Sequence, residues 1–158
     1  MPDGVPRTGL GFDVHGFDRG RSLWLGGVEI GGHDGLAGHS DGDVVCHAVA
    51  DALLGAAALG DVGQHFPDTD PAMAGIAGAD LLRRTVALVE GAGWRPSNVD
   101  VTVVADRPAV SPHRDAMRAA LAAALGLETG AVSVKATRPE GLGLTGDGIG
   151  CLAVAVLT

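Results

Sequence analysis

Near the N-terminus, the stretch GFDVHGF places a carboxylate and an imidazole two residues apart, at Asp13 and His15. In a β-strand, side chains two residues apart point to the same face. A second imidazole, His47, lies in the segment HSDGDVVCHAVADALLGAAALGD, whose apolar spacing predicts a helix. One Asp and two His can bind a metal through three protein ligands and leave a fourth position open, which is the pattern of a catalytic zinc site.

On the predicted helix, Asp43, His47 and Asp51 are spaced four residues apart, so their side chains share one face. The opposite face is apolar and must point to the core. His39 and Ser40 precede the helix, where free backbone N–H groups and the helix dipole favour an anion. Taken alone, each residue has a simpler explanation, such as a strand end, a surface histidine, a helix cap or a solvated face. The metal-site hypothesis therefore depends on the combination.

The elements that must position these residues follow from periodicity and turn residues. Strands are predicted over 7–17, 98–106, 131–137 and 151–158, with a hairpin over 23–32 that turns at Gly26 and Gly27. Helices are predicted over 41–59, 77–92 and 112–125. The segment 64–71, with two prolines and two aspartates, is predicted to be a loop. This order predicts one α/β (α+β) domain over 1–158, with a mixed sheet, helices on one face and a small hairpin.

Composition restricts the classes of function. The net charge of −8 argues against nucleic-acid binding. A phosphorylated small substrate remains compatible, because metal ions or backbone N–H groups can hold phosphate locally. The chain opens with no signal-like segment and has no apolar run long enough to span a bilayer, so we expect a cytoplasmic protein without a membrane partner. Cys46 and Cys151 are expected to be buried free thiols.

Six stretches carry a resemblance: GFDVHGF, HSDGDVVCHAVADALLGAAALGDVG, HFPDTDP, VDVTVVADRP, PH and VSVKAT followed by EGLG. In this order and spacing they resemble the methylerythritol cyclodiphosphate synthase family of the non-mevalonate isoprenoid pathway. The resemblance implies a homotrimer with each active site between neighbouring subunits. It also implies a metal-dependent phosphorus–oxygen lyase that converts 4-diphosphocytidyl-2-C-methyl-D-erythritol 2-phosphate into 2-C-methyl-D-erythritol 2,4-cyclodiphosphate and CMP.

The same resemblance implies the metal ligands and catalytic residues. Asp13, His15 and His47 match the ligands of a zinc ion. Glu140 matches a carboxylate that holds Mg²⁺ or Mn²⁺ together with the substrate phosphates. The positions matching catalytic residues are His39, which matches the family's transition-state stabiliser, and Thr137 and Arg138.

The resemblance further implies two groups of substrate-binding residues. Contacts to the methylerythritol phosphate, its hydroxyls and the reacting phosphates are implied for Asp13, His15, His39, Ser40, Asp61, Val62, Gly63, Phe66, Pro67, Asp68, Thr69, Asp70, Thr137, Arg138, Glu140 and Leu144. Contacts to cytosine, made through backbone groups of the loop 105–111, are implied for Ala105, Pro108, Ala109, Val110 and Ser111. Gly11 and Gly16 are expected to let the diphosphate approach the strand backbone.

Three departures from the family pattern leave alternatives open. Arg138 and Pro139 stand where threonines are usual, although a guanidinium can also grip phosphate. Ala109 replaces a Lys, and the usual TGRGEG is shortened to TGDGIG at 145–150, so no isoprenoid phosphate is predicted in a channel on the threefold axis. One alternative is a non-catalytic CDP-binding homologue. Another is a zinc phosphohydrolase with a water nucleophile, for which Asp51 is the obvious base.

Overall fold

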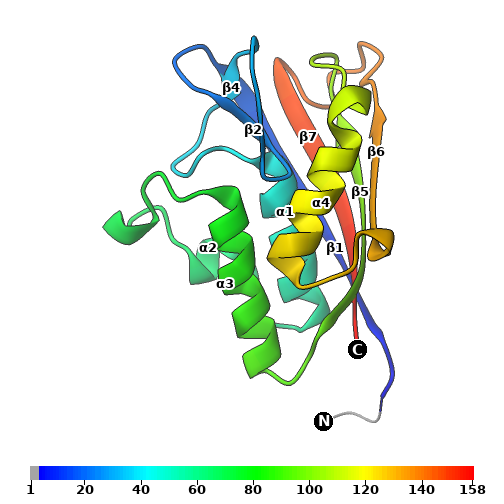
Figure 1. Cartoon of the computed structure of the whole chain (residues 1–158). Helices are drawn as coiled ribbons and strands as arrows, with labels where there is room; N and C mark the ends of the chain where they lie inside the picture. The colour runs from blue at the N-terminus through cyan, green and yellow to red at the C-terminus, as the bar shows by residue number, and fades with distance from the viewer. Residues whose placement is uncertain (1–3) are drawn as a thin grey trace.

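The computed structural model describes residues 4–158. A five-stranded sheet has the order β4–β1–β7–β5–β6, and Figure 1 shows the helices gathered on one side of it. The strands are β1 (Arg7–Asp18), β4 (Gly35–Leu36), β5 (Pro96–Val104), β6 (Val132–Thr137) and β7 (Gly148–Leu157). The pair β5–β6 is parallel and the other pairs are antiparallel, so the predicted mixed sheet is confirmed. The predicted hairpin is also confirmed, as β2 (Leu23–Leu25) and β3 (Val28–Ile30).

The three long helices agree with the predicted ones to within a few residues at each end. They are α1 (Val44–Ala56), α3 (Gly78–Gly91) and α4 (Arg114–Leu125). Shorter turns are α2 (Val62–His65) and the 3₁₀ segments η1 (Pro71–Met73), η2 (Ser111–His113) and η3 (Thr129–Ala131). The predicted start of the first helix is three residues too early, because Asp43 is its N-cap and accepts a hydrogen bond from the Cys46 N–H at 3.0 Å.

The prediction of a continuous loop over 64–71 is wrong at both ends. Asp61 accepts a hydrogen bond from the Gln64 N–H at 3.0 Å and starts α2. Asp70 accepts one from the Ala72 N–H at 2.9 Å and starts η1, with Pro71 in the first turn. Aspartate before a helix and proline in its first turn are starting signals as much as breaking ones. The segment is therefore two short turns joined by a loop.

Strand β1 lies directly against the backbone of α1. A Cβ atom on Gly9 would come within 1.9 Å of the Ala52 carbonyl oxygen, and one on Gly11 within 1.9 Å of the Ala48 carbonyl oxygen. Both positions therefore require glycine for close packing of strand and helix. The expectation that Gly11 admits a diphosphate is wrong, since the helix occupies that space.

The other face of the sheet carries exposed apolar side chains. Leu10, Phe12 and Val14 alternate along β1, with 67%, 46% and 42% of each residue exposed. Leu152 of β7 pairs with Phe12 and is 38% exposed. Both cysteines are buried and unpaired, as predicted. Among residues 4–158, none of the helices combines the length and apolar character that crossing a membrane requires.

Candidate metal centre and substrate pocket

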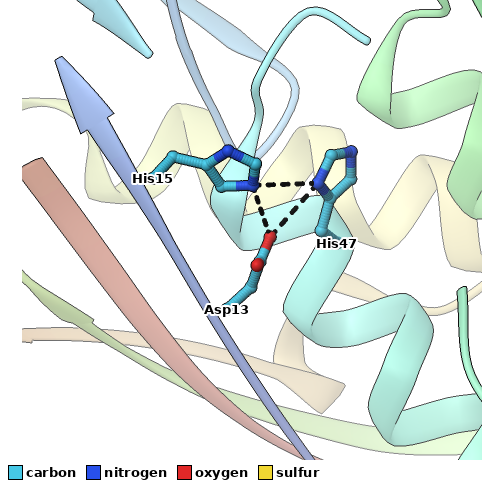
Figure 2. A group of neighbouring side chains, drawn as sticks. All are labelled: Asp13, His15 and His47. Atoms are coloured by element: carbon cyan, nitrogen blue, oxygen red, sulfur yellow. Dashed lines mark hydrogen bonds and ion pairs between the residues drawn. The ribbon is translucent and has the colours of Figure 1, made fainter. Parts of the chain in front are cut away.

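Asp13 and His15 of β1 and His47 of α1 converge on one point, as Figure 2 shows. Asp13 Oδ2 lies 2.7 Å from His15 Nε2 and 3.2 Å from His47 Nδ1. The two imidazole nitrogens are 3.4 Å apart. The glycines that bring β1 against α1 lie on the same strand face as Asp13 and His15, because all four positions are two residues apart. The predicted cluster is thus built by the close packing of one strand on one helix.

These three side chains fit a metal ion. Tetrahedral zinc with ligand bonds near 2.0–2.1 Å needs donor atoms about 3.3 Å apart, close to the spacing found here. His15 Nδ1–H donates to the Ala37 carbonyl at 2.6 Å, which leaves Nε2 with a free lone pair. His47 Nε2 lies 3.0 Å from Ser40 Oγ, so Nε2–H can donate there and leave Nδ1 as the ligand. Fixing the second nitrogen of each ring is the usual support of metal-binding histidines.

The electrostatics of the cluster favour an ionised carboxylate. Burial opposes ionisation of Asp13, but hydrogen bonds and charge interactions with His15 and His47 outweigh it and lower the pKa of Asp13 to about 2. The hydrogen bond to Asp13 raises the pKa of His15. Since a ligating imidazole must be neutral, binding of a metal ion here would require His15 to release the proton that its hydrogen bond with Asp13 favours.

Asp43, the N-cap of α1, does not line the pocket but supports the helix that carries His47. Its buried carboxylate accepts hydrogen bonds from the Gly26 N–H at 2.9 Å, the Gly27 N–H at 2.7 Å and the Cys46 N–H at 3.0 Å. Gly26 and Gly27 both have positive φ, of 60° and 78°, which two-residue hairpin turns of this kind require. Asp43 therefore joins the β2–β3 turn to the first turn of the helix that carries His47.

A pocket of about 480 Å³ opens beside the cluster. It is lined by ten residues that the resemblance assigned to metal or substrate: Asp13, His15, His39, Ser40, His47, Val62, Gly63, Phe66, Pro67 and Asp68. Five further residues also line it: Gly38, Asp51, Met73, Ile76 and Leu81. Asp51 accepts a hydrogen bond from the Val62 N–H at 2.8 Å, and burial raises its pKa. Asp51 thus fixes the start of α2 at the pocket wall.

The apolar part of this wall was not predicted as part of the site. Met73, Ile76 and Leu81 lie in η1, the loop after it and α3, and their apolar character suits an ordinary core equally well. The available signal was their position directly after the aspartate-rich loop 66–70.

A second pocket, of about 320 Å³, lies at the loop after β5 and the end of β6. It brings together seven predicted residues: Ala105, Pro108, Ala109, Val110, Ser111, Thr137 and Arg138. Asp106 and Ala136 also line it, and it shares no residue with the first pocket. Beside it, Arg107 lies over the ring of Phe17 and forms an ion pair with Asp147 at 3.2 Å. The segment 145–150 is thereby joined to the loop 105–111.

Five predicted residues line neither pocket: Asp61, Thr69, Asp70, Glu140 and Leu144. Asp61 and Asp70 cap short helices through their carboxylates. Glu140 is exposed, has a positive φ of 54°, and does not belong to the Asp13 cluster. Leu144 is 55% exposed. Their roles toward substrate stay predictions.

The fold and the cluster together define a mixed α/β protein with an Asp–His–His group that could bind a metal ion beside a pocket. Residues 6–158 match the YgbB family, and the chain belongs to this family. It is 54% identical over 153 residues to the 2-C-methyl-D-erythritol 2,4-cyclodiphosphate synthase of Pseudomonas fluorescens (strain SBW25), which covers 96% of this chain and 98% of that protein.

The solved structures that are similar to this chain include the following two. One is the bifunctional IspDF from Campylobacter jejuni, with a TM-score of 0.91 and 40% identity. The match covers 97% of this chain but only 42% of that one, so this chain spans less than half of the bifunctional protein. The other is a 2C-methyl-D-erythritol-2,4-cyclodiphosphate synthase in its CDP-bound form, with a TM-score of 0.88, 37% identity, and coverage of 96% of this chain and 100% of that one. The predicted family is confirmed.

Proposed function

We propose that this protein converts 4-diphosphocytidyl-2-C-methyl-D-erythritol 2-phosphate into 2-C-methyl-D-erythritol 2,4-cyclodiphosphate and CMP, a step of isoprenoid precursor synthesis. The observation that carries the proposal is the Asp13–His15–His47 cluster, which lines a pocket and whose two imidazoles are each oriented by a second hydrogen bond. The 54% identity to a named synthase over nearly the full length of both chains supports the same activity.

In this proposal Asp13, His15 and His47 hold zinc, which when bound supplies a Lewis acid to the phosphorus under attack. The 2-phosphate oxygen bonds to the β-phosphorus of the diphosphate, and the bond from that phosphorus to the oxygen of CMP breaks. Glu140 and the substrate phosphates hold Mg²⁺ or Mn²⁺. His39 stabilises charge on the transferred phosphate, and Thr137 and Arg138 bind phosphate oxygens. The protein contributes positioning and charge neutralisation, as is usual in phosphoryl transfer.

Bound metal ions would also explain how an acidic pocket binds an anionic substrate. Asp51 and Asp68 line the pocket with the cluster, and the chain carries a net charge of −8. A divalent ion inverts the field that phosphate groups meet there. Binding of a cytidine diphosphate group by this chain is supported by the CDP-bound form of the similar synthase.

We further propose a homotrimer in which each site is completed by a neighbouring subunit. One support is that the metal pocket and the pocket at 105–111 share no lining residue. A second is the exposed apolar face formed by Leu10, Phe12, Val14 and Leu152, since contiguous exposed apolar surface marks an interaction site.

The activity is tested by incubating the purified protein with the cytidyl substrate, Zn²⁺ and Mg²⁺ and following the phosphorus species by ³¹P NMR. Cyclic diphosphate and CMP in equal amounts are expected. A linear phosphate product would instead identify a phosphohydrolase, and bound CDP without turnover would identify a binding protein. Removal of metal with a chelator should stop the reaction, and added Zn²⁺ with Mg²⁺ should restore it.

A further inference from the structure

Arg21, in the turn between β1 and β2, reaches across to the segment 37–40, which lies directly before α1. Its Nη1 donates a hydrogen bond to the Gly38 carbonyl and its Nη2 donates one to the Ser40 carbonyl. Its own backbone carbonyl accepts a hydrogen bond from the Gly35 N–H at 2.9 Å, just upstream of the same segment. Arg21 is therefore bonded to this part of the chain at three points, although it lies 17 and 19 residues away from Gly38 and Ser40.

The segment 37–40 also supports both metal-binding imidazoles. The Ala37 carbonyl accepts from His15 Nδ1 at 2.6 Å, and Ser40 Oγ contacts His47 Nε2 at 3.0 Å. A Cβ on Gly38 would lie 3.4 Å from the His15 ring, so the backbone packs closely against that imidazole. Two ligands from different elements thus share one supporting segment, and a shift of that segment reorients both.

We propose that Arg21 is a positioning residue of the metal centre: by bridging the Gly38 and Ser40 carbonyls, it fixes the segment that orients His15 and His47. The inference rests on the proposed function for the metal itself. A planar guanidinium presents its N–H groups to both carbonyls in a fixed geometry, whereas the donors of an ammonium group sit on one nitrogen at the end of a flexible stem.

Charge and geometry predict opposite effects when Arg21 is removed. The guanidinium is positive, and a positive group beside a divalent cation weakens its binding by repulsion. Loss of the charge alone would therefore strengthen metal binding. Loss of the hydrogen bonds frees the partners of both imidazoles, and loss of such partners lowers metal affinity by about 10- to 100-fold. Whether metal affinity rises or falls when Arg21 is removed therefore distinguishes the effect of charge from the effect of geometry.

The experiment compares the full-length protein with Arg21→Ala, Arg21→Lys and the matched control Arg19→Ala. Arg19 is exposed in the same turn and takes part in none of these hydrogen bonds. Its removal therefore deletes one positive charge from the turn and leaves the hydrogen bonds in place. Zn²⁺ affinity is measured by competition with a chromophoric chelator, and the geometry of the site by the visible spectrum of the Co²⁺-loaded protein. Thermal unfolding of the metal-free proteins reports the fold.

Arg21→Ala is expected to weaken Zn²⁺ binding by about 10- to 100-fold and to change the Co²⁺ spectrum, while metal-free unfolding shifts little. Arg21→Lys should recover part of the affinity, and Arg19→Ala should match the parent protein or bind slightly tighter. Unchanged or tighter binding by Arg21→Ala, with the parent Co²⁺ spectrum, would overturn the proposal. If Arg21→Ala does not fold, the same two measurements on Arg21→Lys decide.

These readouts do not require turnover. A protein that binds Zn²⁺ but does not cyclise the substrate would refute the proposed reaction and leave the Arg21 comparison intact. A parent protein that binds no Zn²⁺ would overturn both.

Discussion

The carboxylate of Asp43 accepts a hydrogen bond from the Gly27 N–H at 2.7 Å, across 16 residues of chain, and so ties a hairpin turn to the start of α1. The same buried side chain also satisfies the N–H groups of Gly26 and Cys46. Three backbone donors from two elements therefore depend on one side chain. A sequence pattern shows the cap but not the hairpin that shares it.

Replacement of Asp43 should be strongly destabilising. In Asp43→Ala, three N–H donors lose their acceptor, and the combined loss of a cap and of buried charge-assisted hydrogen bonds is expected to cost roughly 3 kcal/mol or more. Urea unfolding of the metal-free protein measures this. Asp115→Ala, in the first turn of α4 and with a side chain 93% exposed, is the control and should change the free energy of unfolding by less than about 0.5 kcal/mol. Equal effects of the two variants would contradict the role given to Asp43.

The contact between β1 and α1 has no room for a methyl group at Gly11. Gly11→Ala would place Cβ 1.9 Å from the Ala48 carbonyl oxygen, so strand and helix must separate, at an expected cost of about 3 kcal/mol or more. Gly16→Ala is the matched control on the same strand, since the nearest atom to its Cβ would be the Asp147 carbonyl oxygen at 3.8 Å. Chemical denaturation compares the two, and a Gly11→Ala protein as stable as Gly16→Ala would refute the close packing.

Removal of one ligand should abolish metal binding but not folding. His47→Ala leaves two ligands, and we expect loss of stoichiometric zinc by elemental analysis together with loss of cyclising activity. The circular dichroism spectrum should remain that of the parent protein. His33→Ala, an exposed histidine in the segment between β3 and β4, should keep both zinc and activity. Full zinc content in His47→Ala would show that the metal is bound elsewhere.

A charge on the apolar sheet face should prevent assembly. Phe12→Asp places a carboxylate among Leu10, Val14 and Leu152, where a neighbouring subunit would have to desolvate it. The parent protein is expected to elute at the mass of three chains, and the variant at that of one, when size exclusion is combined with light scattering. Thr8→Asp is the control, on the same strand face at its exposed N-terminal end. A parent protein that elutes as a monomer would contradict the trimer.

The two cysteines should be inert in the folded protein. Burial raises the pKa of Cys46 well above its usual range, and burial likewise raises the pKa of Cys151, so neither thiol ionises near neutral pH. Reaction with a thiol-specific reagent at pH 8 is expected to be slow until denaturant is added, and then to modify two groups per chain. Fast modification of the native protein would contradict the burial of both side chains.

The sequence predicted best those parts of the fold whose signal lies in consecutive residues. Strand β1 and the body of α1 were predictable, because alternation of exposed and buried positions in a strand and apolar spacing in a helix can be recognised within one short segment. The turns α2 and η1 were missed because Asp61, Asp70 and Pro71 can break a helix or begin one, and only the fold decides.

The candidate site was predictable for a different reason. Asp13, His15 and His47 emerged from residue type and spacing, and the resemblance then supplied the substrate residues. What neither could supply was the support behind the imidazoles. The contacts of Ala37 with His15 and of Arg21 with Ser40 join segments about twenty residues apart, and they involve backbone carbonyls that any residue would present. Such contacts cannot be predicted from the sequence alone.

The two faces of β1 have different roles, and the register of the strand fixes both at once. Ligands and the helix-facing glycines occupy the odd-numbered positions from Gly9 to His15, and the apolar residues Leu10, Phe12 and Val14 occupy the even ones. Inserting or deleting a single residue within this stretch would exchange the two sets. It would turn the carboxylate and imidazole outward, and drive bulky side chains into the helix backbone. A change of length within β1 would therefore disrupt the metal cluster and the apolar face together, whereas a point substitution changes only the face on which its side chain lies.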